Sequence, residues 1–406
     1  MSLAPVFLRR VSLQNYMSIA RCSVELRPLN VLVGPNGAGK SNFLDALRFT
    51  SESLTTSVEH ALRERGGIAE VRRRSAGHPT HFGVRLEWAL PNGTHGVFAF
   101  VIGARPGAGF EIQKELCEIN PPDALGAQIR YEVRSGEIHD CTLAVRPAAA
   151  ADRLFLVAIS GQPEFRPLYD ALLRMGFYNF NPDVIRELQS PDPGEVLSSD
   201  GRNLASVLKR LSESQPPERM GRVVEMLGKV VPGIRDVAHK PVGKKETLEF
   251  RQTVAGSRDT WRFDAENMSD GTLRALGVLV ALNQTPASDG RTVRLVGIEE
   301  PETALHPGAA SVLRAALFEA SHHTQVLVTS HSPELLDDKE VTGDSLISVA
   351  SRDGETIIRP VDEASRTSIR DRLFTAGELL RLNQLAPDSA GNASGSGSQL
   401  DLFAQS

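Results

Sequence analysis

Gly34-Pro35-Asn36-Gly37-Ala38-Gly39-Lys40-Ser41 follows an apolar run, Leu29 to Val33, and precedes a helical pattern that begins at Phe43. This order of strand, glycine-rich loop and helix predicts a phosphate-binding loop. Glycines let backbone N–H groups approach phosphate oxygens, and the helix N-terminus adds positive charge. Lys40 is expected to reach the β- and γ-phosphates of a nucleotide, and the Ser41 hydroxyl to bind Mg²⁺. The nucleotide-binding residues predicted in this segment are Asn36, Gly37, Gly39, Lys40, Ser41 and Asn42.

Composition indicates a soluble globular protein of 406 residues, with 41% hydrophobic and 23% charged residues. The net charge of -5 restricts any contact with DNA to a local patch. Cys22, Cys117 and Cys141 are scattered, which indicates neither a zinc site nor a disulfide framework and fits a reducing cytoplasm. The sequence shows neither a signal peptide nor an apolar run of membrane-spanning length, so no membrane association is expected.

The pattern of strands and helices predicts one α/β head over residues 1–385. Alternating apolar residues predict an antiparallel β lobe over about residues 80–160, and apolar stripes predict a short helical insertion over about residues 195–245. The last third alternates strands and helices, which is typical of a parallel sheet with crossover helices. The fold class expected is a P-loop NTPase with a mixed sheet core. Residues 386–406 are expected to form a flexible tail.

The segment Arg294 to Glu302 reads as an apolar strand that ends in carboxylates. At such a strand end one carboxylate can hold Mg²⁺ and the next can deprotonate the attacking water. We assign Glu299 to the metal and Glu300 to the general base. The alternative is a solvated acidic turn. The phosphate-binding loop upstream favours the catalytic interpretation of these carboxylates.

Two further motifs complete the set. Ser269-Asp270-Gly271 precedes a strongly apolar helix, so Ser269, Gly271 and the following N–H groups could form a second anion site that meets the γ-phosphate held by another subunit. An ordinary helix N-cap explains the same residues, and the sequence does not separate the two. Thr329-Ser330-His331-Ser332-Pro333 ends a predicted strand, where His331 could contact the γ-phosphate and the attacking water.

These four motifs, in this order, resemble the ATP-binding-cassette ATPases, and more narrowly the branch with SMC-type heads, RecF and the ATPase part of OLD-type nucleases. Asn42-Phe43-Leu44 after the loop, Ser269-Asp270-Gly271 and Glu299-Glu300-Pro301-Glu302 are similar to that branch. The resemblance covers about residues 5–360. It implies a homodimer that encloses two ATP molecules. Each site would pair Ser269 of one subunit with residues of the other, namely Lys40, Ser41, Glu299, Glu300 and His331. It also implies a link to DNA repair, or to phage defence with a partner nuclease.

The sequence departs from this branch in three ways. Glu299 stands where aspartate is usual, so the geometry at the metal is in question. The glutamine of the Q-loop is not identifiable, and Asn179 or Asn181 lies near its expected place. Too few residues follow His331 for a C-terminal Toprim nuclease domain, so an associated nuclease would be a separate chain.

Two segments suggest partners. The tail ends in Gln399-Leu400-Asp401-Leu402-Phe403, which is similar to the peptide that binds the bacterial sliding clamp through Gln399, Leu400, Leu402 and Phe403. A tail that folds back onto its own body is the alternative. A basic stretch could contact DNA phosphates or be a solvated face with internal ion pairs. Its arginines are Arg63, Arg65, Arg72, Arg73 and Arg74.

The resulting hypothesis is a Mg²⁺-dependent ATPase that senses or regulates events on DNA. One rival is a regulatory subunit that holds a separate effector protein and uses ATP as a switch. Another is the ATPase subunit of a transporter, against which Ser269-Asp270-Gly271, Asn42 and the predicted β lobe argue.

Overall fold

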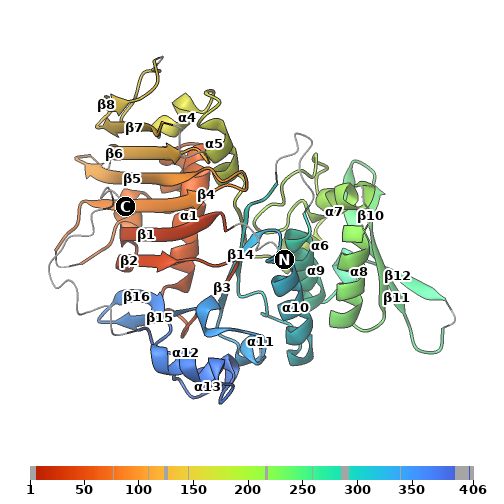
Figure 1. Ribbon diagram of the computed structural model, residues 1–406. Helices are drawn as coiled ribbons and strands as arrows, with labels where there is room; N and C mark the ends of the chain where they lie inside the picture. Colours follow the sequence, from red (N-terminus) through yellow and green to blue (C-terminus); the bar gives the residue numbers. More distant parts are fainter. Residues whose placement is uncertain are drawn as a thin grey trace.

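The computed structural model describes residues 6–75, 77–107, 109–122, 127–144, 146–214, 218–257, 259–284, 292–338, 340–388 and Leu402. Figure 1 shows an antiparallel β lobe at one end, a smaller sheet at the other, and a mixed sheet between them.

The central sheet has six strands in the order β16-β15-β3-β14-β13-β9. All neighbouring strands pair in parallel except β15 and β16, which are antiparallel. The strands are β3 (Leu29–Val33), β9 (Gly176–Tyr178), β13 (Leu295–Glu299), β14 (Gln325–Ser330), β15 (Leu346–Arg352) and β16 (Glu355–Pro360). The inner strands are apolar along their length because both faces of this sheet are covered.

Side chains alternate between the faces of a strand, so the central sheet separates two hydrophobic cores. Leu32 and Leu327 point into a core shared with the β lobe and helix α1 (Lys40–Thr55). Val33 and Val328 point into a second core with helices α9 (Asp270–Leu282) and α10 (Ala310–Ala320). The phosphate-binding loop, which joins β3 to α1, therefore lies at the junction of both cores.

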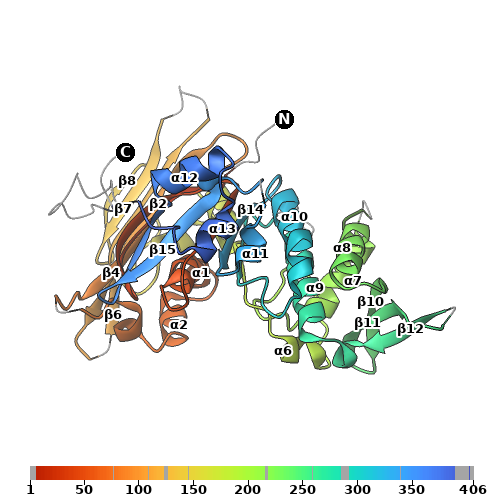
Figure 2. The ribbon, with the colours of Figure 1, turned by 90° about the horizontal axis from the view of Figure 1, so that it is seen from below.

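The β lobe is a seven-stranded antiparallel sheet in the order β2-β1-β4-β5-β6-β7-β8. Its inner face packs on α1, where the rings of Tyr16, Phe49 and Phe82 form edge-to-face pairs. Figure 2 shows α1 and α2 on this side of the sheet. The strands are β1 (Leu8–Tyr16), β2 (Ile19–Glu25), β4 (His81–Ala89), β5 (His95–Arg105), β6 (Gly109–Asn120), β7 (Ile129–Arg134) and β8 (Glu137–Cys141).

The remaining α-helices cover the sheets and connect them. They are α2 (Val58–Arg63), α3 (Ile68–Val71), α4 (Phe155–Ile159), α5 (Arg166–Leu173), α6 (Pro182–Arg186), α7 (Leu204–Glu213), α8 (Glu218–Val230), α11 (Pro333–Leu336), α12 (Glu363–Arg370) and α13 (Ala376–Arg381). Three short 3-10 turns occur at Ala265–Asn267, Pro307–Ala309 and Gly343–Ser345. None of the helices in the described ranges is long and apolar enough to cross a membrane.

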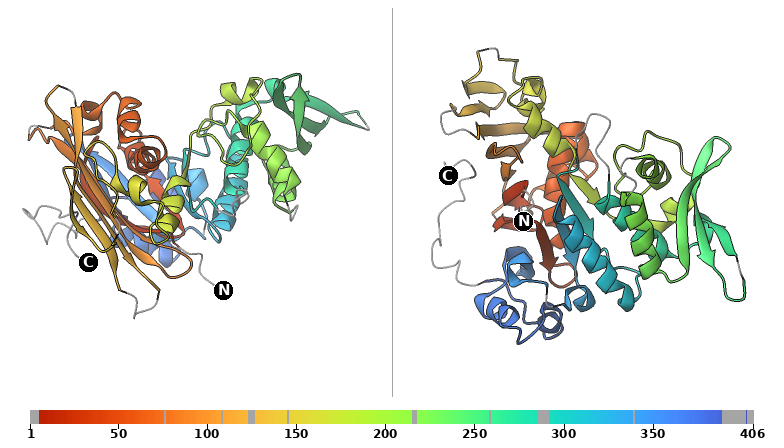
Figure 3. Two further views of the ribbon diagram at one scale, coloured as in Figure 1. Left: turned by 90° about the horizontal axis from the view of Figure 1, so that it is seen from above. Right: turned by 45° about the vertical axis from the view of Figure 1, so that its right-hand side comes forward.

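The mixed α/β architecture is the class predicted from the sequence. The sequence interpretation missed a three-stranded sheet that follows α7 and α8, with strands β10 (Ile234–Val242), β11 (Lys245–Thr253) and β12 (Thr260–Asp264). Both views of Figure 3 place this sheet at the end of the molecule away from the β lobe. The buried apolar residues of β10 and β11 are Ile234, Val237, Leu248 and Phe250, and β12 has no buried residue, so the apolar alternation was weak in the sequence.

Candidate nucleotide site

The topology of the central sheet brings the predicted motifs together. Strands β3, β14 and β13 are neighbours and run in parallel, with Ser330 opposite Val33 and Glu299 opposite Thr329. Their carboxyl ends therefore meet at one edge of the sheet, where α/β proteins place ligands. The phosphate-binding loop, His331 and the Glu299-Glu300 pair all follow these strand ends.

Strand β16 contacts the phosphate-binding loop through Thr356. Gly39 has φ of 100°, and a Cβ there would lie 2.2 Å from the Thr356 Oγ1 atom. The Thr356 hydroxyl donates to the Ala38 carbonyl at 2.8 Å. The loop conformation thus requires glycine at position 39 for both backbone and space.

Lys40 is buried and donates its ammonium to the carbonyls of Gly34 at 2.8 Å and Pro35 at 3.1 Å. Burial lowers the pKa of Lys40, and the carboxylates of Glu300 and Glu302 oppose that shift. The ammonium therefore rests on the loop carbonyls within the electrostatic reach of two acidic groups, where phosphate oxygens could replace those carbonyls.

The other predicted residues of the loop differ in their surroundings. Asn36, Gly37 and Ser41 are exposed, with Ser41 in the first turn of α1. The Asn42 amide instead donates to the Ser18 hydroxyl at 2.6 Å, and so holds the β1–β2 turn to α1. The structure thus gives Asn42 a structural partner, and its role in nucleotide binding stays a prediction.

Glu300 and His331 come from different motifs and meet at this edge. The Glu300 Oε1 atom lies 3.3 Å from the His331 Nδ1 atom, and both side chains are partly exposed. The backbone of Glu300 has φ of 43°, and its N–H donates to the Thr329 carbonyl at 3.0 Å. A non-glycine residue held in this conformation is uncommon and is typical of functional sites.

Glu299 is the last residue of β13. It lines a small cavity with Asn179 and with Asp45 and Arg48 of α1. Asn181, the other candidate for the Q-loop position, caps helix α6 through the N–H of Asp183. Of the two asparagines, the structure therefore places Asn179 beside the candidate metal residue.

The described residues contain no group of three His, Cys, Asp or Glu side chains that could hold a metal ion. Mg²⁺ does not require such a cage, because it commonly binds through one or two carboxylates, water and substrate phosphates. The Ser41 hydroxyl and the Glu299 carboxylate supply oxygen ligands of the type that Mg²⁺ prefers, so this donor set fits the ion.

Glu302 is a carboxylate at this edge that the sequence interpretation did not assign. Its Oε1 atom accepts from the Ser330 hydroxyl at 2.6 Å and from the His331 N–H at 3.4 Å. Its Oε2 atom is buried without a hydrogen-bond partner among the described residues. Burial raises the pKa of Glu302. The third carboxylate of the Glu299-Glu300-Pro301-Glu302 run was the signal that could have identified it.

Ser269 is the N-cap of helix α9. Its hydroxyl accepts from the Thr272 N–H at 3.3 Å, which is the geometry of an ordinary cap. The same helix end packs closely on the turn after Glu300, because a Cβ at Gly271 would lie 2.5 Å from the Ala304 carbonyl oxygen. Ser269 therefore caps helix α9, and the N-terminus of this helix lies beside the segment that follows Glu300.

Comparisons with known proteins show which families the chain resembles. A family model described as "AAA domain, putative AbiEii toxin, Type IV TA system" matches residues 183–337, and one described as "AAA ATPase domain" matches residues 7–81. The chain is 22% identical over 382 residues to the Old nuclease of Escherichia phage P2. It resembles the SMC head solved with the C-winged helix domain of ScpA, with a TM-score of 0.52 and 13% identity over 88% of this chain and 99% of that one. The chain is thus similar to ABC/SMC/OLD-like AAA ATPases.

The alignments differ in how much of each relative they cover. The alignment with the Old nuclease covers 87% of this chain and 61% of the nuclease, so the chain spans less than two thirds of that relative. A second SMC head, from Pyrococcus furiosus, matches with a TM-score of 0.49 and 13% identity over 90% of this chain and 99% of that chain. The SMC head with a TM-score of 0.52 establishes the P-loop fold predicted from the sequence.

The predicted basic stretch is mostly engaged in internal contacts. Arg65 is largely buried, forms ion pairs with Asp45 and Glu52, and stacks over the Phe49 ring. Arg72 donates to the Pro79 carbonyl, and Arg73 donates to the Glu355 carboxylate. Arg74 donates to the Glu70 carboxylate. In this stretch Arg63 and Arg74 are exposed. The structure thus favours internal ion pairing, and it removes Arg65 from the predicted DNA-binding set.

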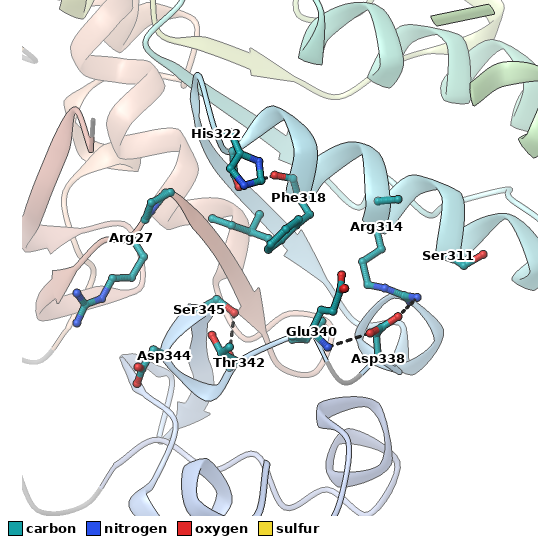
Figure 4. Close-up of a pocket in the computed structure, with 15 residues that line it drawn as sticks. Arg27, Ser311, Arg314, Phe318, His322, Asp338, Glu340, Thr342, Asp344 and Ser345 are labelled. Atoms are coloured by element: carbon teal, nitrogen blue, oxygen red, sulfur yellow. Dashed lines mark hydrogen bonds and ion pairs between the residues drawn. The ribbon is translucent and has the colours of Figure 1, made fainter. Parts of the chain in front are cut away.

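A cavity of about 600 Å³ lies at the other end of the central sheet, between α10 and the start of β3. Figure 4 shows Phe318, Arg314 and His322 of this region with Arg27 near the β3 strand. Leu29, the first residue of β3, lines this cavity, whereas the phosphate-binding loop follows the last residue of the same strand. The cavity is therefore separate from the candidate nucleotide site.

Proposed function

We propose that the protein is a Mg²⁺-dependent ATP hydrolase. The observation that carries this proposal is the pairing of Glu300 with His331 at 3.3 Å, at the sheet edge that also holds Lys40. In the proposed reaction Glu300 takes a proton from a water molecule as its oxygen attacks the γ-phosphorus. The bond from that phosphorus to the bridging oxygen breaks, which releases ADP and phosphate.

The side chains around the site have distinct proposed roles. Lys40 leaves the Gly34 and Pro35 carbonyls and turns to the β- and γ-phosphates. His331 orients the attacking water and contacts the γ-phosphate. Ser41 and Glu299 hold Mg²⁺, which when bound neutralises charge that develops on the phosphate oxygens.

The proposed enzyme is a homodimer that encloses two ATP molecules. The N-terminus of α9 adjoins the turn after Glu300 and offers oriented N–H groups to an anion. In the proposed dimer, Ser269 and Gly271 of each subunit meet the γ-phosphate bound by the other. The likeness to SMC heads supports this arrangement.

The proposed setting is DNA-linked regulation in the cytoplasm, in genome maintenance or phage defence. The likeness to the Old nuclease supports this setting. The chain spans 61% of that relative.

A second candidate function is an ATP-switched subunit that holds a separate effector. The match of residues 183–337 to a domain described with a putative toxin favours this alternative. The effector would then be a nuclease or a toxin, and the rate of ATP turnover would not respond to DNA.

One experiment separates the two functions. ATP turnover by the purified protein is measured alone and with duplex, gapped and single-stranded DNA, with Glu300→Gln as the blank. Stimulation by one form of DNA supports DNA-linked regulation. A rate above the Glu300→Gln blank that is equal in all four conditions rejects the DNA link and supports the effector-holding subunit.

The proposed partners also include a bacterial sliding clamp, bound through the C-terminal peptide. Its anchors would be Gln399, Leu400, Leu402 and Phe403. Of these, Leu402 lies within the described residues and the other three lie outside them.

A further inference from the structure

Leu402 lies against the body of the protein. The residue is 2% exposed, and its carbonyl accepts from the Arg85 Nη1 atom at 2.8 Å. Arg85 is itself 7% exposed and lies on β4 in the β lobe. A guanidinium of this low exposure needs hydrogen-bond acceptors, and the Leu402 carbonyl supplies one of them.

The contact is on the outer face of the β lobe. Along β4, Phe82, Val84 and Leu86 point into the core with α1. Side chains alternate along a strand, so Gly83 and Arg85 face the other way. This face is the one away from the nucleotide-binding core.

The Leu402 side chain packs closely on Gly83 of this face. A Cβ at Gly83 would lie 2.3 Å from the Leu402 Cδ1 atom and 3.0 Å from the Val101 Cγ2 atom. The small residue Ala99, opposite Arg85 on β5, is fully buried. Glycine inside a strand gives up side-chain packing, and it often marks a place where another group approaches closely. At Gly83 the group that approaches is Leu402.

We propose that the outer face of the β lobe at Gly83 and Arg85 is a docking site that holds the chain's own C-terminal segment in cis through Leu402. The linker allows this, because the fourteen residues after Asp388 up to Leu402 can span about 45 Å when extended. A tethered segment also has a high effective concentration, so one leucine anchor and one charged hydrogen bond suffice for docking.

The docking site has a consequence that rests on the proposed clamp binding. Leu402 is an anchor for both the β lobe and the clamp, so it can serve one of them at a time. Docking on the β lobe therefore lowers the apparent affinity of the chain for the clamp by the fraction of time that the tail is free. The β lobe would act as an internal competitor for the clamp-binding peptide.

The first test measures the mobility of the tail in the full-length protein. A spin label is attached to Ala404→Cys, since the three native cysteines are buried. The labelled protein that carries no further substitution should give a slow spectral component. That component should be lost in Leu402→Asp, in Arg85→Met and in Gly83→Ala, whose new methyl group would overlap the leucine.

Matched controls keep this test specific. Gly161→Ala should retain the slow component, because a Cβ there meets nothing within 4 Å. Arg134→Met should also retain it, because Arg134 is an exposed arginine elsewhere on the β lobe. A fast spectrum in the unaltered body, or one that Gly83→Ala and Arg85→Met leave unchanged, overturns the docking site.

A mixing experiment distinguishes docking in cis from docking between copies. Labelled Gly83→Ala protein is mixed with an excess of unlabelled Leu402→Asp protein, whose docking site is intact and vacant. The cis proposal predicts that the label stays mobile. Recovery of the slow component would show that tails dock on other copies, and would overturn the proposal.

The second test uses a purified bacterial sliding clamp. If the tail is docked for nine tenths of the time, Gly83→Ala should bind the clamp about tenfold more tightly than the unaltered protein. Leu402→Asp should lose binding. Equal clamp affinity in Gly83→Ala and the unaltered protein contradicts the competition. Absence of clamp binding in every variant rejects the clamp as partner, while the mobility results still decide the docking site.

Discussion

Glu302 shows how one residue can be tied to several parts of a site. Its carboxylate receives the Ser330 hydroxyl and the His331 N–H, and its charge acts on Lys40. It therefore connects the end of β14 with the lysine of the phosphate-binding loop. We assign it a positioning role rather than a chemical step.

Glu302→Gln should lower the kcat for ATP by about tenfold, in the range seen when a supporting side chain around a site is altered. The amide oxygen can still accept from Ser330, so the variant should fold, but the negative charge near Lys40 is lost. Burial raises the pKa of Glu302, so its ionised form is lost at a higher pH than for an exposed glutamate.

The pH profile of kcat distinguishes this role from a purely structural one. The unaltered enzyme should lose activity on the acid side as Glu302 takes up a proton, and Glu302→Gln should lack that ionisation. Glu340→Gln, at an exposed site, is the control and should match the unaltered enzyme. An identical acid limb in the Glu302 variant would show that this carboxylate does not contribute.

At the residue scale, local sequence motifs predicted several residues of the candidate site. Lys40, Glu300 and His331 lie in local motifs, and the structure brings them to one edge. Sequence reasoning did not find Thr356 below Gly39, Ser18 on Asn42 or Leu402 on Arg85, because each contact joins residues distant in the chain. The sequence left open whether Arg65 contacts DNA or forms internal ion pairs, because its partners Asp45 and Glu52 are not apparent from a run of arginines.

At the scale of elements, a buried carboxylate joins strand β6 to helix α4. Glu115 is fully buried and accepts from the Tyr131 hydroxyl at 2.6 Å and from the N–H groups of Phe155 at 2.5 Å and Leu156 at 2.9 Å. Burial raises its pKa from the usual 4.5 to about 7, although these hydrogen bonds oppose the shift. The link holds the β lobe to the chain that leads back to the central sheet.

This link predicts that stability falls as pH rises. Between pH 4.5 and 7 the folded state retains a proton on Glu115 that the unfolded state has lost, so the free energy of unfolding decreases through that window. The loss is up to about 3 kcal/mol, from the size of the pKa difference. Urea unfolding of the unaltered protein, of Glu115→Gln and of the exposed control Glu137→Gln measures it. A decrease of equal size in Glu115→Gln would assign the pH dependence to other groups.

The phosphate-binding loop gives a second prediction for an element. Gly39→Ala should weaken ATP binding by tenfold or more, because alanine at this φ costs about 1 to 3 kcal/mol and its methyl group would displace Thr356. Isothermal titration with ATP and Mg²⁺ measures the affinity, with Gly161→Ala as the control. Unchanged affinity in Gly39→Ala would show that the loop does not need this conformation.

The elements themselves were predictable where their patterns were long. The apolar runs of β13 and β14 and the stripes of α7 and α8 are visible in the sequence. The sheet of β10, β11 and β12 was not, because one face is polar and its buried residues are sparse. The joining of β1 and β2 to β4 in one sheet depends on a pairing across the whole phosphate-binding segment, which local periodicity does not reveal.

At the scale of the whole molecule, the proposed homodimer holds ATP between its two subunits. Ser269 tests this with substitutions that keep its capping role. Aspartate and asparagine both cap helices as well as serine does. Ser269→Asp would add a negative charge opposite the γ-phosphate of the partner's ATP, whereas Ser269→Asn would not.

Ser269→Asp should therefore lower ATP turnover at least tenfold with little change in thermal stability, and Ser269→Asn should retain more of the activity. ATP turnover and thermal unfolding of both variants are the measurements. If both variants hydrolyse ATP at the unaltered rate, Ser269 is a cap without a role at a shared site. The dimer itself cannot be read from local sequence patterns, because it depends on how two surfaces meet.

We propose that this protein hydrolyses ATP with Glu300 as the base. The most direct test is steady-state ATP turnover by the unaltered protein, Glu300→Gln and Glu340→Gln. We predict that Glu300→Gln loses about 100-fold or more in kcat, the range expected for a general base, while Glu340→Gln keeps the unaltered rate. Turnover by Glu300→Gln at the unaltered rate would contradict the role of Glu300 as the base.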